Sequence, residues 1–141
     1  MFKKIVVGTD GSGTAARAVS HAAELAKRTG AELLVVSVYR APSDAAPPLA
    51  NPNETPGIEV AHGLLEDVSK RYGQEITLRT VPREGKPADA LLDVAEEEGA
   101  DVIIVGSRGM SGAKRFVLGS VPNTVSHHAP CHVLIVHTTD E

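Results

Sequence analysis

The sequence predicts an α/β protein in which helices cover both faces of a doubly wound parallel sheet. Aliphatic runs alternate with stretches of helical spacing along the 141 residues, in the order β-α-β-α-β-α-β-α-β, which implies parallel pairing through right-handed crossovers. Aromatic residues make up only 3% of the chain and Trp is absent, so Ala, Val, Leu and Ile must fill the core. Such aliphatic filling is usual around buried parallel strands. We expect a five-stranded, Rossmann-like sheet with four helices, in a single domain that spans residues 1–141.

Local sequence marks each element in turn. Strands are expected at 5–8, 33–38, 76–81, 101–105 and 132–137, and the third of them alternates as an edge strand does. Helices are expected at 15–26, 61–72, 87–95 and 121–129, and glycines at positions 30, 73 and 99 are placed to end the first three. The stretch 41–57 holds five prolines and predicts a long loop, a candidate for a segment that shifts when a ligand binds.

Charge and composition exclude several classes of protein. The net charge is −4 and no long basic run is present, whereas nucleic-acid binding needs clustered Lys and Arg to replace counterions. The single cysteine, Cys131, cannot form an intramolecular disulfide, which suits a reducing compartment. No apolar stretch has the length of a signal peptide or a membrane span. We therefore expect a cytoplasmic protein that binds neither nucleic acid nor membrane.

Two predicted strand ends carry the residues of a candidate ligand site. The first strand ends in Gly8-Thr9-Asp10, and the fourth, after Val105, opens a G-x2-G-x9-G-S pattern formed by Gly106, Gly109, Gly119 and Ser120. Glycines let backbone amides approach an anion, and a helix that begins at Ser120 adds unpaired amides and its positive dipole end. The hydroxyl of Ser120 can cap that helix or donate to a phosphate. The pattern predicts a phosphate cradle with nearby cations at Arg108, Lys114 and Arg115; the alternative is that the glycines only make turns.

At these residues the chain resembles the universal stress proteins, over nearly its full length. The resemblance rests on Ile5-Val6-Val7-Gly8-Thr9-Asp10-Gly11-Ser12, Gly106-Ser107-Arg108-Gly109, Gly119-Ser120-Val121 and Pro130-Cys131-His132-Val133-Leu134-Ile135-Val136. The glycine spacing resembles the pattern that marks the ATP-binding branch of that family. The opening and ending segments are shared more widely within it and say less about binding.

The resemblance implies the strand order 3-2-1-4-5, with the first and fourth strands at the switch point where such sheets bind ligands. It implies that Asp10 contacts the nucleoside, that the backbone of Val38 meets adenine, and that a homodimer forms through Val133–Val136. The implied ligand is ATP or another adenine nucleotide, with Mg²⁺ as a companion of the phosphates. The candidate binding residues are Gly8, Thr9, Asp10, Val38, Val105, Gly106, Arg108, Gly109, Gly119, Ser120 and Val121, and no catalytic or metal-ligating residue is assigned.

Pro122 departs from the family's pattern, in which many ATP-binding members carry a hydroxyl residue at this place. Proline offers neither an N–H nor a hydroxyl to a phosphate, which leaves room for AMP or cyclic AMP. The expected function is regulatory nucleotide binding in a stress response. The alternatives are a slow ATPase on the same fold and a dimer subunit that has lost its ligand. A conventional enzyme is not expected, because a Gly-Lys-Ser/Thr phosphate loop is missing and Asp10 is the one nearby candidate base.

Four further features have plain structural interpretations. Asp10 can also serve as a turn-capping residue ahead of the first helix, because Asp-Gly-Ser-Gly favours a turn. The histidines at 127, 128, 132 and 137 lack the spacing of a zinc site and are expected on the solvated surface. Cys131 is expected to act as a small hydrophobe before the last strand. The run Glu96–Glu98 is expected at the solvated end of a helix, although its charge opposes the helix dipole.

Overall fold

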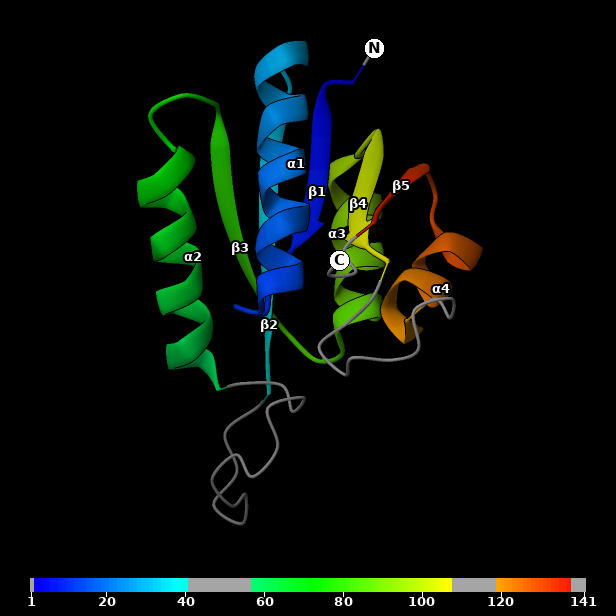
Figure 1. The fold of residues 1–141 in the computed structure, drawn as a ribbon. Helices are drawn as coiled ribbons and strands as arrows, with labels where there is room; N and C mark the ends of the chain where they lie inside the picture. The colour runs from blue at the N-terminus through cyan, green and yellow to red at the C-terminus, as the bar shows by residue number, and fades with distance from the viewer. Residues whose placement is uncertain (1, 41–56, 108–118, 138–141) are drawn as a thin grey trace.

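The computed structural model describes residues 2–40, 57–107 and 119–137. Within these ranges five parallel strands form one sheet in the order β3-β2-β1-β4-β5 (Figure 1). The strands are β1 (Lys4–Gly8), β2 (Glu32–Tyr39), β3 (Leu78–Glu84), β4 (Val102–Gly106) and β5 (His132–Val136). The helices are α1 (Gly13–Thr29), α2 (Ile58–Tyr72), α3 (Pro87–Glu98) and α4 (Ser120–His128). The predicted fold class, element order and strand order are confirmed. Of the predicted loop at 41–57, residues 41–56 lie outside the described residues.

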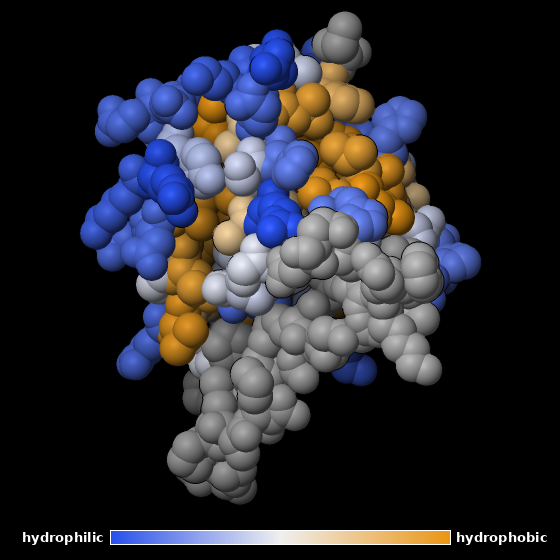
Figure 2. Space-filling model, in the orientation of Figure 1, coloured by the Kyte–Doolittle hydropathy of each residue, from blue (hydrophilic) through white to orange (hydrophobic). Residues whose placement is uncertain are grey.

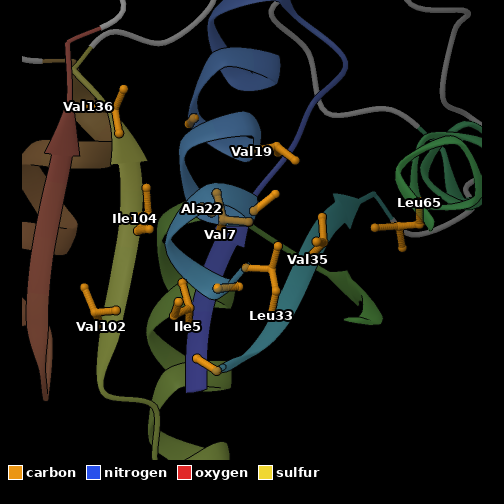
Figure 3. Close-up of a cluster of buried hydrophobic side chains, with 14 residues drawn as sticks. Ile5, Val7, Val19, Ala22, Leu33, Val35, Leu65, Val102, Ile104 and Val136 are labelled. Atoms are coloured by element: carbon orange, nitrogen blue, oxygen red, sulfur yellow. The ribbon is translucent and has the colours of Figure 1, made fainter. Parts of the chain in front are cut away.

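The two faces of the sheet bury two separate aliphatic clusters. Alternate strand residues such as Ile5, Leu33 and Ile104 pack with the small residues of α1 and with Leu65 of α2 (Figure 3). The intervening strand residues, among them Leu34 and Ile103, pack with α3 and with α4 on the opposite face. Both side-chain sets of β1, β2 and β4 are therefore buried, which is why these strands appear in the sequence as continuous aliphatic runs.

The boundaries of β3 differ from the prediction. The strand begins at Leu78, because the amide of Ile76 donates to the carbonyl of Tyr72 at 3.3 Å and so completes the turn after α2. It then runs through Pro82 to Glu84, beyond the predicted end at Val81. A proline is tolerated here because β3 lies at the edge of the sheet and pairs with β2 alone.

The β3 edge of the sheet carries arginines, and these pair with the acidic run at the end of α3. The guanidinium of Arg79 binds the carboxylate of Glu98 at 2.7 Å, and Lys4 approaches the same carboxylate at 3.3 Å. Arg83 donates to Glu97 at 3.1 Å. Hydrogen bonds from these arginines lower the pKa of both Glu97 and Glu98. The predicted solvated acidic end of the helix is confirmed, and two of its three carboxylates pair there with cations from neighbouring strands.

The opposite edge, at β5, is apolar. Leu134 is 43% exposed and Ile135 39% exposed, and they project to the two faces of the strand. Figure 2 shows hydrophobic surface gathered on the side of the molecule where β4 and β5 lie. None of the described helices is long and apolar enough to cross a membrane. The two sheet edges therefore differ sharply in chemistry, one ion-paired and the other aliphatic.

Candidate functional site

The central strands β1 and β4 part at their carboxyl ends. Their pairing runs up to Val7 and Ile104 and stops there. Beyond it, the amide of Thr9 donates to the carbonyl of Val36 in β2 at 2.9 Å. The amide of Ser107 donates instead to Val136 in β5, at 2.7 Å. The backbone thus turns toward opposite sides at the point where strand order reverses, which is the place where doubly wound sheets bind ligands.

The two halves of the glycine pattern meet directly. Gly119 donates its amide to the carbonyl of Ser107 at 3.0 Å, so the start of α4 is fixed against the end of β4. Gly119 holds the N-cap position of α4, with φ −63° and ψ 165°. Of the two roles open to Ser120, capping the helix is therefore excluded, and its exposed side chain stands at the first helical position. The amides of Ser120 and Val121 belong to the first turn, where N–H groups have no partner within the helix.

Asp10 shapes the turn after β1 but does not cap α1. Its Oδ1 accepts the amide of Ser12 at 2.9 Å, and the hydroxyl of Thr9 accepts the amide of Gly11 at 3.3 Å. The N-cap of α1 is Ser12, whose Oγ accepts the amide of Ala15 at 3.1 Å. The interpretation of Asp10 as a turn-capping residue ahead of the first helix is thus confirmed. A carboxylate has further acceptor capacity on its second oxygen, and the Asp10 side chain is exposed.

Two leucines from opposite helical layers pack against the glycines of this turn. A Cβ at Gly8 would lie 3.3 Å from Cδ2 of Leu91 in α3. A Cβ at Gly11 would lie only 2.8 Å from Cδ2 of Leu64 in α2, and Gly11 has a positive φ of 83°. Only glycine adopts that conformation readily, so both the backbone and the packing require it at position 11. The sequence placed both leucines on apolar helix faces but gave no sign that they reach the turn.

The apolar candidates lie on one face of the sheet. Val38 and Val105 are 9% and 5% exposed and belong to the cluster under α3 and α4, and Val121 packs against the same cluster. This cluster therefore extends to the carboxyl edge, beside Gly106. Buried apolar side chains thus support the backbone at the carboxyl ends of β2 and β4. Arg108 and Gly109 lie outside the described residues.

A family model described as the universal stress protein family matches residues 1–137. The chain belongs to the universal stress protein family. The universal stress protein Rv1636 of Mycobacterium tuberculosis (strain ATCC 25618 / H37Rv) is 38% identical over 146 residues, and the match covers 98% of each chain.

Solved universal stress proteins share the fold. One crystal structure, of a universal stress protein in complex with cAMP, is 32% identical, has a TM-score of 0.76 and covers 98% of this chain and 99% of that one. A family member from Arabidopsis thaliana with AMP bound has a TM-score of 0.67 at 19% identity, with 97% of this chain and 92% of that chain covered. At that identity the second likeness shows the fold alone.

Ser37 lies next to the candidate binding residue Val38, and no pattern in the sequence singled it out. It is 1% exposed, and its Oγ has no hydrogen-bond partner among the described residues. It directly precedes Val38, and its neighbours by alternation, Leu33 and Val35, belong to the cluster under α1 and α2. A serine within a run of valines and leucines looks like an ordinary strand residue, so only the structure reveals the unsatisfied hydroxyl.

His127, His128, His132 and Cys131 lie away from the strand ends that form the site, whereas His137 directly follows the carboxyl end of β5. His127 and His128 end α4 with ring centroids 6.5 Å apart, and His132 contacts Phe2 edge-on at the start of β5. The described residues include no group of three or more side chains suited to holding a metal. Burial, and then the charge of Asp101, raise the pKa of the Cys131 thiol. A raised pKa fits the interpretation of Cys131 as a small hydrophobe and disfavours a reactive thiolate.

Proposed function

We propose that this chain binds an adenine nucleotide at the carboxyl ends of β1 and β4 and acts as a regulatory stress-response protein of the cytoplasm. The observation that carries the proposal is the hydrogen bond between Gly119 and Ser107, which brings the glycine pattern and the N-terminus of α4 to the switch point. The cAMP complex of a family member at 32% identity supports the choice of an adenine nucleotide.

Each candidate residue has a distinct role in this proposal. Asp10 accepts hydrogen bonds from the ribose hydroxyls, and the backbone of Val38 and of Val105 contacts the nucleoside. The amides around Gly106, Gly109 and Gly119 and the hydroxyl of Ser120 bind the phosphates, with Arg108 as the cation. Where the ligand is a triphosphate, an accompanying Mg²⁺ would neutralise part of the phosphate charge.

Binding without rapid turnover is the function that the site supports best. Phosphoryl transfer requires a positioned nucleophile and usually a base. The sole carboxylate of the described strand-end turns is Asp10, and its Oδ1 already accepts the amide of Ser12. ATP, through the G-x2-G-x9-G-S pattern, is the first candidate ligand. AMP or cyclic AMP is the second, favoured by Pro122 and by the relative that binds cAMP.

The proposal includes a homodimer formed through β5. An edge strand exposes unpaired backbone groups, and natural proteins protect such edges with charge or proline. The β3 edge carries both, as Arg79, Arg83 and Pro82, whereas β5 presents Leu134 and Ile135. This contrast supports association at β5 and disfavours association at β3.

Substitution of Gly119 tests the proposal, because its dihedral angles suit any residue. Gly119→Asp places a carboxylate where the phosphates bind, and Gly119→Asn is the neutral isostere. Both residues are good N-caps, so both variants should fold at least as stably as the wild type. Titration calorimetry with ATP, AMP and cyclic AMP should show binding lost in Gly119→Asp and largely kept in Gly119→Asn. Equal affinities in the two variants would exclude a phosphate at this helix end.

The identity of the ligand is tested independently. Protein purified without added nucleotide is denatured, and the released small molecules are identified by mass spectrometry. An adenine nucleotide in stoichiometric amount supports the proposal. A wild type that carries none and binds none of ATP, AMP and cyclic AMP would contradict it.

A further inference from the structure

The turn that carries Asp10 is supported from outside by a helix that is distant in sequence. Leu64 of α2 lies so close to Gly11 that a Cβ there would be 2.8 Å from Cδ2, 3.5 Å from Cδ1 and 3.8 Å from Cγ of the leucine. The branched end of the side chain therefore covers the α-carbon of Gly11. A contact of this kind fixes a backbone position as firmly as a hydrogen bond does, because packed atoms cannot interpenetrate.

Beyond the amide of Thr9, which donates to the carbonyl of Val36 in β2, the hydrogen bonds of the turn are short in range. Gly11 donates to Thr9 and Ser12 donates to Asp10, and each bond spans two residues. Gly11 itself is exposed, and glycine has the largest backbone freedom to lose. Local bonds alone leave the turn free to pivot as a unit about its two ends. Contact with a side chain from another element removes that freedom.

Leu64 is itself held in place by its helix. Its neighbours Ala61 and Leu65 are 0% and 3% exposed and anchor α2 on the sheet. Val68, one turn further along α2, packs against the same cluster. Leu64 is only partly buried, and its side chain packs against Gly11 of the turn rather than in the centre of the core.

We infer that Leu64 is a positioning residue for nucleotide binding: it holds Gly11 in its left-handed conformation and thereby sets the direction of the Asp10 carboxylate. The inference rests on the proposed function, since Asp10 is assigned to the nucleoside there. It adds a residue from α2, an element to which neither the glycine pattern nor the strand ends assign a role in binding.

A double-mutant cycle tests whether Leu64 acts through Asp10. The four proteins are the wild type, Leu64→Ala, Asp10→Asn and the double variant, titrated with whichever of ATP, AMP and cyclic AMP the wild type binds. Leu64→Ala should weaken binding by about tenfold in the wild-type background and by less than about threefold in the Asp10→Asn background. Leu64→Met, which conserves volume, should restore most of the affinity.

Val68→Ala is the matched control on the same helix. It also removes a partly buried apolar side chain from α2 and should reduce stability, yet it should leave the affinity unchanged. All titrations are made at a temperature at which circular dichroism shows every variant folded. A merely structural role for Leu64 would make the two alanine variants behave alike.

Hydrogen exchange gives a second measurement, made without ligand. The amides of Gly11 and Ser12 should exchange faster in Leu64→Ala than in Val68→Ala, because their hydrogen bonds depend on the shape of the turn. If the wild type binds nucleotide but the two substitutions act additively, the inference is wrong and the proposed function stands. If the wild type binds none of the three nucleotides, the proposed function fails and the inference fails with it.

Discussion

The amide of Gly119 donates a hydrogen bond to the carbonyl of Ser107 at 3.0 Å, although twelve positions separate the two residues. This bond joins the end of β4 to the beginning of α4 and so brings the two ends of the glycine pattern together. It also orients the first turn of α4 toward the sheet edge where β1 and β4 part. Backbone amides with no partner in the helix thus lie at the carboxyl end of β4, the strand that neighbours β1 in the sheet.

Ser37→Ala should stabilise the protein by about 1 kcal/mol, since it removes a buried hydroxyl that has no partner among the described residues. Urea unfolding of the ligand-free protein measures the change. Ser69→Ala, an exposed position on α2, is the control and should change stability by less than about 0.5 kcal/mol. A clear loss of stability in Ser37→Ala would show that the hydroxyl does have a partner in solution.

Lys substitutions at β5 should convert a dimer into a monomer. Leu134→Lys and Ile135→Lys place charge on the two exposed positions of the strand, whereas Val136 is 6% exposed and a lysine there would unfold the protein instead. Sedimentation velocity at micromolar concentration should show a dimer for the wild type and for Thr77→Lys, an exposed position beside the opposite edge. A monomeric wild type would contradict the proposed dimer.

Stability should fall in acid because of Asp101. Its carboxylate accepts the amides of Lys3 and Lys4 at 2.7 and 2.9 Å, and these bonds lower its pKa below the ordinary 3.8. A pKa that is lower in the folded protein gives stabilisation that is present above the unfolded value and is lost as the pH falls through the folded value. Hydrogen bonds from arginines also lower the pKa of Glu97 and of Glu98, so these residues likewise contribute to the loss of stability in acid.

Urea midpoints measured between pH 6 and pH 3 test this expectation. The wild type should lose stability steadily over the lower part of this range. Asp101→Asn should be less stable at pH 6 and should show a shallower decline, because the substituted amide does not titrate. Asp67→Asn, at an exposed position on α2, should follow the wild-type curve. Parallel curves for Asp101→Asn and the wild type would mean that Asp101 contributes nothing to the acid sensitivity.

The sequence predicts the architecture well because its signals are local. The aliphatic runs of β1, β2 and β4 are strands buried on both faces. Gly30 and Gly99 end their helices in the left-handed conformation with φ 74° and 64°. The glycine pattern likewise predicts the start of α4 at Ser120, because a break in one periodic segment and the start of another are visible in the chain itself.

The remaining features depend on contacts between distant segments. The pairing of Glu98 with Arg79 joins α3 to β3, and its geometry follows from how the helix lies across the sheet. The contact of Leu64 with Gly11 depends on the placement of α2 beside α1. No spacing in the sequence indicates either contact, because helix periodicity shows which face of a helix is buried but not which residues that face contacts.

Pro122 provides the sharpest test of which nucleotide the site prefers. It is buried at the third position of α4, where it lacks the N–H that would otherwise join the amides of Ser120 and Val121. If the missing groups weaken the hold on the terminal phosphate, Pro122→Ser should improve ATP binding. A hydrogen bond to a charged group contributes about 1.5–3 kcal/mol, which is about tenfold to a hundredfold in affinity.

Pro122→Ala separates the two missing groups, because it restores the N–H without adding a hydroxyl. We expect ATP affinity to rise in the order wild type, Pro122→Ala, Pro122→Ser, while AMP and cyclic AMP affinities stay within about threefold of the wild type. Both variants should also lose some stability, since a buried ring is removed. If Ser120 and the neighbouring amides already saturate the phosphates, the three proteins will bind ATP equally. A wild type that prefers ATP over AMP by more than about a hundredfold would likewise show that Pro122 does not limit the grip on the terminal phosphate.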